Sequence, residues 1–148
     1  MIKKLAVRNA VLLVLIMLIL SLGIIWWVDA NLLGGVKQVQ RQIGVSTVYT
    51  TDEIDAAIDR IIAHFRSNFS GCELLNIWYD EARSLPAAEG WRQQYGADEA
   101  IVLYSDFKVN AKDAWKQGLE TGETYRNWCW VLVRNGAGAW ELKTWGYG

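Results

Sequence analysis

The hydrophobic and polar positions of the chain follow three successive patterns, and the first is one uninterrupted apolar run. Residues 10–28 read AVLLVLIMLILSLGIIWWV and contain no charged side chain. As a helix rising about 1.5 Å per residue, this run is about as long as the hydrocarbon core of a bilayer is thick. It predicts a single transmembrane helix, so residues 1–28 are expected to form a cytoplasmic tip and an anchor whose partner is the lipid bilayer.

The charges on either side of the apolar run predict its orientation. Three basic residues precede the run: Lys3, Lys4 and Arg8. Because positively charged flanks remain in the cytoplasm, the carboxy-terminal part is expected on the other side of the membrane. Trp26 and Trp27 then lie at the external membrane interface, where indole rings are favoured.

A cleaved signal peptide is the alternative interpretation of the same run. Val28-Asp29-Ala30 offers small residues at the two positions that a signal peptidase recognises, and cleavage there would give a secreted domain. The apolar run is longer than the roughly 7 to 15 residues usual in such a segment, and two Trp lie close to the cleavage point. These features favour an uncleaved anchor.

The second pattern has a helical period and begins at Thr50. Thr50-Thr51-Asp52-Glu53 matches a capping box, with a hydroxyl at the cap and a Glu three residues later. The apolar side chains that follow share one face at about 100° per residue: Ile54, Ile58, Ile61, Ile62, Phe65 and Phe69. These positions predict an amphipathic helix of about 19 residues that ends near Gly71.

The third pattern has a period of two residues, which is typical of β-strands. Four segments rich in aromatic and β-branched residues show it: 72–80, 99–109, 125–134 and 139–145. Asn135-Gly136-Ala137-Gly138 predicts a hairpin turn between the last two segments. The intervening segments 82–95 and 111–124 are expected to be loops.

One helix followed by four strands predicts an α+β domain over residues 50–148. The helix is expected to pack on one face of a curved, mostly antiparallel, four-stranded sheet. Residues 29–49 contain a Gly pair near their start, Gly34-Gly35, and are expected to be a tether with one or two helical turns. A domain of this length buries enough apolar surface to fold without a disulfide or a metal.

The composition excludes several classes of protein. Of the 148 residues 52% are hydrophobic, which excludes disorder and collagen-like structure. The formal charge is -1 and no long basic run occurs, so a dedicated nucleic-acid binder is not expected. All 16 acidic residues and 12 of the 15 basic residues follow the apolar run, so the exported part is mildly acidic.

Several motifs in order connect the chain to a known family. They are TTDEIDAAIDRIIAHF, GCELLNIWYDE, YGADEAIVLYSDFKV, YRNWCWVLVRN and WELKTWGYG. Over residues 48–147 this combination resembles a bacterial family of small exported domains of unknown function. The resemblance implies an exported location and a fold of the cystatin-like or nuclear transport factor 2-like group. It implies no activity, because that family has no agreed catalytic residues to carry over.

The carboxy-terminal hairpin contains the candidate binding residues. A short loop is expected to pair Trp128 with Trp145, Trp130 with Lys143 and Leu132 with Glu141 on one face of the sheet. The other face is continuously apolar and is expected to pack on the helix: Cys129, Val131, Val133, Trp140 and Leu142. The first face is either a second covered core layer or a ligand or partner surface formed by Trp128, Trp130 and Trp145, joined by Tyr104 and Trp78.

Candidates for catalysis and metal binding are few. His64 is the only His and is expected on the exposed flank of the helix. Asp80 or Asp106 beside Tyr104 is the nearest approach to an acid–base site. No Cys/His cluster indicates zinc and no glycine-rich loop follows a strand, so neither a metal nor a cofactor is expected.

The two cysteines, Cys72 and Cys129, have two interpretations. They form a disulfide if the exported compartment is oxidising and the two side chains meet. Otherwise they are separate thiols, and Cys129 acts as a small buried hydrophobe.

Three functions follow from these observations. The sequence favours a non-enzymatic, membrane-anchored module outside the cytoplasm that binds a small ligand, an envelope protein or a second copy of the chain. The second function is a small-molecule enzyme that uses Asp80 or Asp106 in a cavity. The third is a structural subunit of a membrane complex, with the Trp face covered by another chain.

Overall fold

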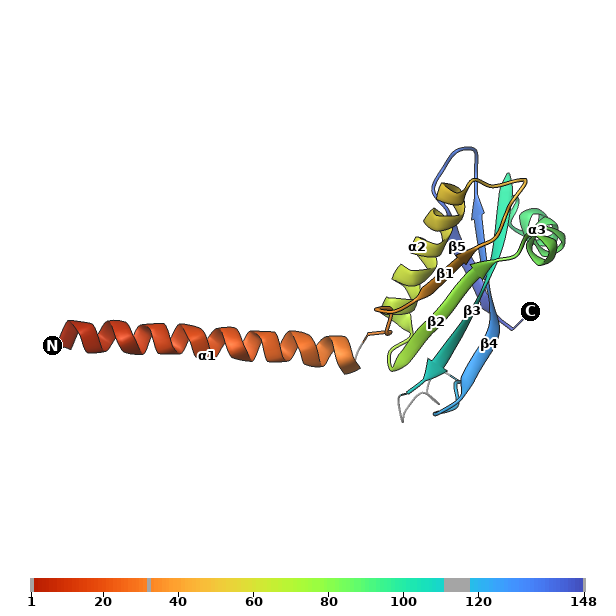
Figure 1. The fold of residues 1–148 in the computed structure, drawn as a ribbon. Helices are drawn as coiled ribbons and strands as arrows, with labels where there is room; N and C mark the ends of the chain where they lie inside the picture. Colours follow the sequence, from red (N-terminus) through yellow and green to blue (C-terminus); the bar gives the residue numbers. More distant parts are fainter. Residues whose placement is uncertain (1, 32, 111–117, 148) are drawn as a thin grey trace.

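A computed structural model describes residues 2–31, 33–110 and 118–147 of the chain. The elements follow in the order α1 (Ile2–Asn31), β1 (Gln40–Ile43), α2 (Thr51–Asn68), β2 (Cys72–Tyr79), α3 (Glu81–Tyr95), β3 (Glu99–Val109), β4 (Thr124–Arg134) and β5 (Glu141–Gly146). The strands form one sheet in the order β1-β2-β3-β4-β5. Helices α2 and α3 lie on its two opposite faces (Figure 1).

The α+β class is confirmed, but the predicted four-stranded sheet is corrected to a mixed, five-stranded one. β1 is parallel to β2, and the other neighbouring strands are antiparallel. The fifth strand escaped prediction because β1 is short and mostly exposed, so no apolar alternation marks it. β3 has the predicted ends, and nearly all of its eleven residues are buried because helices cover both faces of the sheet there.

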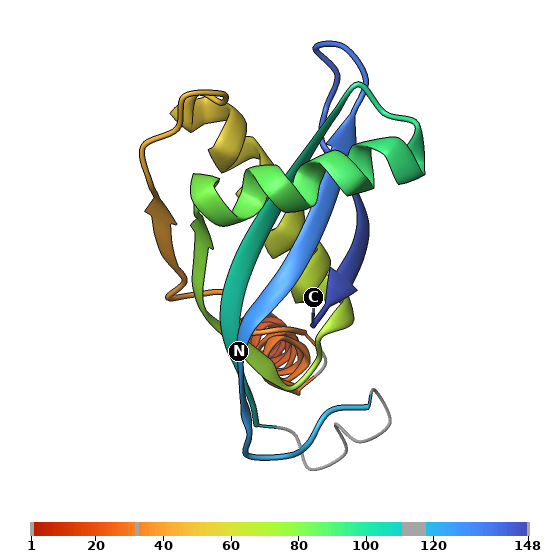
Figure 2. The same ribbon diagram turned by 90° about the vertical axis from the view of Figure 1, so that its right-hand side faces the viewer.

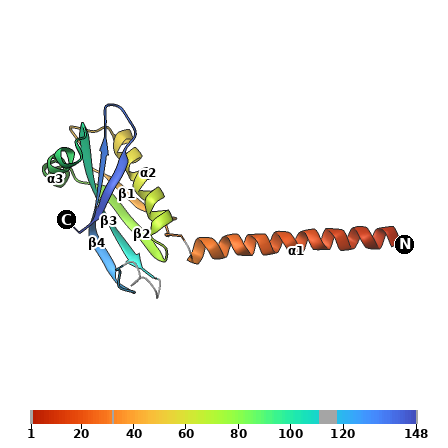
Figure 3. The same ribbon diagram turned by 180° about the vertical axis from the view of Figure 1, so that it is seen from behind.

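Helix α1 projects away from the domain as an isolated apolar rod (Figure 3). Its segment Val11–Val28 is long and apolar enough to cross a membrane, and none of it is buried against the domain. A signal sequence near the amino terminus has the same properties. Trp26 and Trp27 lie in its last turns with most of their surface exposed.

Helix α2 starts at the predicted cap. Glu53 N donates to Thr50 Oγ1 at 3.3 Å, and Thr50 N donates to Glu53 Oε2 at 2.8 Å, which completes the capping box. The predicted apolar stripe faces the sheet, and its buried residues are Ile54, Ala57, Ile58, Ile61 and Phe65. Its burial in the main core explains why α2 has a strong helical period.

Helix α3 replaces the loop expected over residues 82–95. Asp80 caps it by accepting a hydrogen bond from Ala82 N at 3.1 Å, and Gly96 ends it in the left-handed conformation. The buried residues of α3 are small, Ser84 and Ala88 among them, so the helix shows almost no apolar stripe. Pro86 inside the helix is a second reason why the sequence indicated a loop.

The segment expected to be a tether is built into the domain from Gly34 onward. Gly34 N donates to Arg66 O at 2.8 Å, and a Cβ on Gly34 would lie 2.5 Å from Phe65 O. Arg41 of β1 pairs with Asp55 at 3.0 Å and Asp59 at 2.7 Å on α2. A strand and close backbone contacts therefore replace the expected helical turns.

Three β-bulges decide which side chains face α2. They lie between Leu74 and Asn76 in β2, opposite Asp106 in β4, and between Leu142 and Thr144 in β5. A bulge adds one residue to a strand and so reverses the in-and-out alternation beyond it. The sheet therefore keeps its apolar side chains on the α2 face along strands whose sequence does not alternate strictly.

The sheet separates a large core beneath α2 from a smaller one beneath α3, and Figure 2 shows α3 crossing the other face of the sheet. The large core includes Phe65, Phe107, Trp130 and Leu132. The small core includes Ala88, Val102, Tyr104, Val131 and Val133.

The amino-terminal end of β3 extends beyond β2, because the chain leaves β2 for α3 after Tyr79. Two side chains satisfy the backbone of β3 there. Val102 N donates to the buried Ser84 Oγ at 3.1 Å, and Tyr49 OH donates to Ala100 O at 2.9 Å. These bonds tie α3 and the start of α2 to β3.

Candidate binding surface

The structure divides the four predicted surface residues between the two faces of the sheet. Trp128, Trp130 and Trp145 lie on the α2 face, whereas Tyr104 lies on the α3 face with Trp78. Trp130 is 0% exposed and donates its indole N–H to Ser105 Oγ at 2.8 Å. Of the two interpretations of Trp130, the covered core layer therefore holds.

The predicted hairpin register is wrong. β4 and β5 pair Trp130 with Trp145, Leu132 with Leu142 and Val133 with Glu141. Two differences produce this register: next to the turn Leu132 pairs with Leu142 instead of Glu141, and beyond that pair Lys143 is an additional residue in a β5 bulge. The additional residue places Leu142 and Trp145 on the same face of the sheet. Strand periodicity alone would put these two residues on opposite faces, because they are three positions apart.

The prediction of which hairpin face packs on α2 is corrected for β4 only, because Trp140 and Leu142 do lie in the core beneath α2. The face with Trp130 and Leu132 packs beneath α2, and the face with Val131 and Val133 packs beneath α3. The sequence offered no reason to place a second helix over Val131 and Val133, because α3 was expected to be a loop.

Five ring side chains form an aromatic ridge on the α2 face beside β5: His64, Tyr125, Trp128, Trp145 and Tyr147. Trp145 is 42% exposed and Tyr147 is 65% exposed, while the other three are half-buried. Ring centroids are 4.2 Å apart for His64 and Trp145, and 5.2 Å apart for Trp128 and Tyr147. The ridge continues the core outward to the surface, since Trp145 also lies 6.2 Å from Trp130.

Two ring nitrogens of the aromatic ridge have no hydrogen-bond partner within the described ranges. They are His64 Nε2 and Trp128 Nε1, and both atoms are buried. Buried polar groups in proteins are nearly always paired, because an unpaired one loses its bonds to water without replacement.

The prediction of a solvated His64 is wrong. Its ring packs against Trp145 and lies 6.2 Å from both Phe69 and Trp130. Burial lowers the pKa of the His64 imidazole, because the charged form is less well solvated there. The helix pattern placed His64 correctly at the flank of the apolar stripe, but β5 covers that flank.

Tyr147 was not predicted as part of the surface. It lies two positions after Trp145, so continued strand alternation was an available signal. A shallow hollow of about 570 Å³ lies next to the aromatic ridge, between α2 and β5. Its lining residues are Arg60, Ala63, His64, Glu141 and Leu142.

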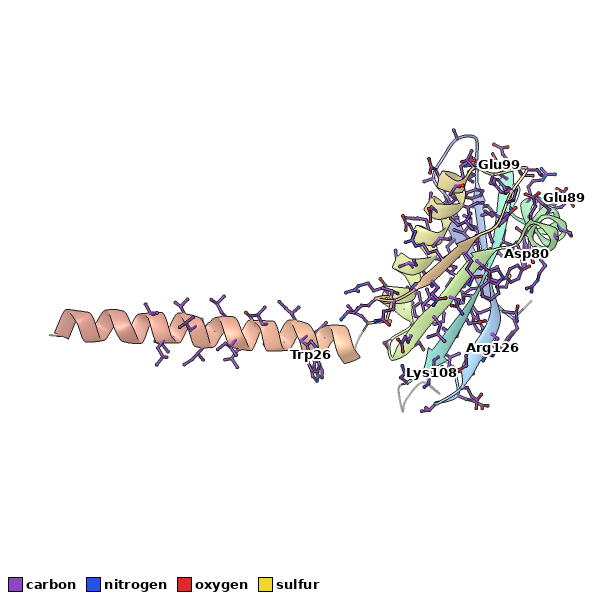
Figure 4. The ribbon with its side chains drawn as sticks, viewed as in Figure 1. Trp26, Asp80, Glu89, Glu99, Lys108 and Arg126 are labelled. Atoms are coloured by element: carbon purple, nitrogen blue, oxygen red, sulfur yellow. The ribbon has the colours of Figure 1, made fainter. Side chains whose placement is uncertain are left out.

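The two carboxylates considered for catalysis, Asp80 and Asp106, accept hydrogen bonds from backbone N–H groups. Asp80 caps α3, and Asp106 Oδ1 accepts a hydrogen bond from Asn127 N at 2.9 Å. Asp106 also lies 3.8 Å from Arg126 Nη1. Tyr104, 8% exposed, lies under the guanidinium of Arg83 rather than against a carboxylate. Figure 4 shows Asp80 where β2 meets α3, well above Arg126 on β4.

Cys72 and Cys129 are both free thiols. Cys72 belongs to the core beneath α2 and Cys129 lies on the α3 face, so the sheet separates them. Burial raises the pKa of the Cys72 thiol to about 11. Within the ranges that the structure describes, no group of three or more His, Cys, Asp or Glu residues is arranged to hold a metal ion.

Comparison with known proteins assigns the chain to no family. No protein-family model, no curated protein and no solved structure matches it. The class that the geometry defines is an α+β domain of three layers, with one helix on each face of the sheet, that follows an apolar helix of membrane-span length and has an aromatic ridge at the edge of its large core.

Proposed function

We propose that this chain is a single-pass membrane protein whose α+β domain binds a protein partner outside the cytoplasm through the aromatic ridge. The observation that carries the proposal is the exposed pair Trp145 and Tyr147, whose rings pack on His64 and Trp128. Trp and Tyr contribute most of the binding energy at many protein interfaces, because they bury large area at low entropic cost.

The membrane anchor is supported by α1 itself. Its apolar side chains from Val11 onward are exposed to the surroundings, and contact with lipid would remove them from water. The basic residues before the run favour a cytoplasmic amino terminus. Trp26 and Trp27 would then lie at the external interface.

The proposal extends to the fold group. A long helix packed on one face of a curved, largely antiparallel sheet supports a cystatin-like or nuclear transport factor 2-like fold, and with it the resemblance to the exported bacterial family. The parallel strand β1 and the helix α3 on the second face are additions to that plan.

Topology is tested with epitope tags at the two ends of the full chain in spheroplasts. Before protease is added, the chain should have its full mass. External protease should then remove the carboxy-terminal tag and leave the amino-terminal tag intact. A chain shortened by about 30 residues would show that the run is a cleaved signal peptide. A protected carboxy-terminal tag would contradict the proposed orientation.

Binding is tested by photocrosslinking in intact membranes. A benzophenone amino acid replaces Trp145 or Tyr147 in two variants, and Gln93 on the exposed side of α3 in a control variant. Specific products are expected from the ridge positions only, and the mass of the product distinguishes a second copy from another protein. Equal products at all three positions, or none at the ridge, would contradict the proposal.

A further variant combines Trp145→Ser and Tyr147→Ser. In this variant the benzophenone amino acid replaces Tyr125, a neighbouring residue of the aromatic ridge. The crosslinked product should disappear while the thermal unfolding temperature changes little, because both side chains are largely exposed. A large drop in that temperature would mean that the ridge belongs to the core.

A further inference from the structure

We propose that Arg83 forms a binding site for a carboxylate group on the α3 face of the sheet, opposite the aromatic ridge. This site is independent of the function proposed for the ridge. The argument rests on how Arg83 is held, on its charge partners and on the apolar surface beside it.

Arg83 is exposed, yet its guanidinium is fixed from two directions. Its Cζ lies 3.9 Å from the ring centroid of Tyr104, and Nη1 donates to Asn127 Oδ1 at 2.9 Å. Stacking on the ring and the hydrogen bond to the amide together orient the planar group. A fixed guanidinium loses less conformational entropy when it binds an anion than a free side chain does.

Asn127 is itself held in an uncommon conformation for this contact. Arg126 and Asn127 together lie opposite Asp106 in the β4 bulge, and Asn127 has φ 55°, the left-handed region that Asn tolerates better than most residues. Its backbone N–H donates to Asp106 Oδ1 at 2.9 Å. The bulge thus fixes the backbone of Asn127 while its amide oxygen holds Arg83.

Arg83 differs from other arginines of the domain in its ion-pair partners. Four of them pair with Asp or Glu: Arg41, Arg92, Arg126 and Arg134. Among the ion pairs of residues 33–110 and 118–147, Arg83 takes part in none. A guanidinium fork matches the two oxygens of a carboxylate, which makes a carboxylate ligand the fitting partner.

The surface next to Arg83 is aromatic. Trp78 is half-buried, and its ring centroid lies 6.2 Å from that of Tyr104 with the planes tilted by 30°. Cys129 is half-buried on the same face. A ligand whose carboxylate pairs with Arg83 could therefore rest an apolar group on this surface, as the terminal carboxylate of a peptide ending in an aromatic residue would.

The experiment uses the full chain in detergent micelles, labelled with ¹⁵N-arginine, and observes the Arg83 Nε–Hε resonance, assigned by its loss in Arg83→Gln. N-acetyl-phenylalanine is titrated in, with N-acetyl-phenylalanine amide and inorganic phosphate as separate arms. A saturable shift at millimolar concentration is expected with the free carboxylate only. Equal shifts with the amide, or stronger ones with phosphate, would overturn the carboxylate assignment.

Two variants and a control separate the site from general effects, with binding followed by the quenching of Trp fluorescence. Arg83→Gln should weaken binding at least tenfold. Asn127→Gly keeps the left-handed backbone and removes the amide oxygen, so it should weaken binding severalfold in a folded chain. Arg92→Gln on the same helix should bind like the parent. Unchanged binding in Arg83→Gln, or no saturable binding by the parent chain, would overturn the proposal.

Discussion

Trp130 and Trp145 lie directly opposite each other on β4 and β5, with ring centroids 6.2 Å apart, yet they have opposite environments. Trp130 is completely buried beneath α2, whereas 42% of Trp145 is exposed in the aromatic ridge. The pair therefore marks the boundary between the core that stabilises the domain and the surface proposed to bind a partner.

Replacing the two indoles with alanine should have unequal effects on stability. Trp130→Ala should lower the free energy of unfolding by about 3 to 5 kcal/mol, because it leaves a cavity and removes the partner of Ser105 Oγ. Trp145→Ala should cost about 1 kcal/mol or less. Urea unfolding followed by circular dichroism measures both, and comparable losses would contradict the assigned boundary.

Gly34→Ala should destabilise the domain, because the added Cβ would lie 2.5 Å from the carbonyl oxygen of Phe65. Gly90→Ala is the matched control, since nothing lies within 4 Å of a Cβ at this position in α3. The control should leave stability unchanged or raise it by about 0.5 to 1 kcal/mol. Thermal unfolding of both variants tests whether the segment before β1 belongs to the folded domain.

Tyr49→Phe should lower the free energy of unfolding by about 1 to 3 kcal/mol, because the buried carbonyl of Ala100 loses its donor. Burial also raises the pKa of Tyr49 to about 12, so the phenol remains a donor throughout the neutral range. Tyr95→Phe on α3 is the control, as Tyr95 is exposed. Equal effects in the two variants would show that the hydrogen bond contributes little.

Acid should weaken the domain partly through Glu53. The hydrogen bond from the Thr50 backbone, followed by that from Arg134, lowers the pKa of Glu53 from its ordinary 4.5 to about 2. A carboxylate with a lowered pKa in the folded state stabilises the fold above its unfolded pKa, and this contribution is lost as the pH falls from about 4.5 toward 2. Glu53→Gln should therefore show a smaller loss of stability between pH 6 and pH 3.

The control for this titration is Glu120→Gln, at an exposed position that is not one of the two carboxylates paired with Arg134, Glu53 and Glu99. Melting temperatures are measured at intervals between pH 6 and pH 3. Glu120→Gln should show the same fall with pH as the parent chain, whereas Glu53→Gln should show a smaller one. An unchanged pH dependence in Glu53→Gln would mean that neither the hydrogen bond from Thr50 N nor the salt bridge to Arg134, with N···O 2.6 Å, contributes to acid sensitivity.

Local patterns predicted the parts of the fold that depend on local interactions. The capping box at Thr50 and the apolar stripe from Ile54 to Phe65 determine α2, because both operate within a few turns of one helix. The ends of β3 were also predicted correctly, since the segment is rich in aromatic and β-branched residues. The predicted candidate surface was only partly recovered, since Trp145 and Trp128 belong to the aromatic ridge while Trp130 is core and Tyr104 supports Arg83.

The sequence by itself determined an apolar helix of membrane-span length, the amphipathic helix α2 and a strand-rich remainder, since period and caps are properties of consecutive residues. Only the tertiary structure decided the strand register, the added strand β1, the covering helix α3 and the contact between Arg83 and Asn127. The physical reason is that a bulge is defined by the neighbouring strand, and small residues such as Ala88 indicate a packed helix only when the surface they contact is known.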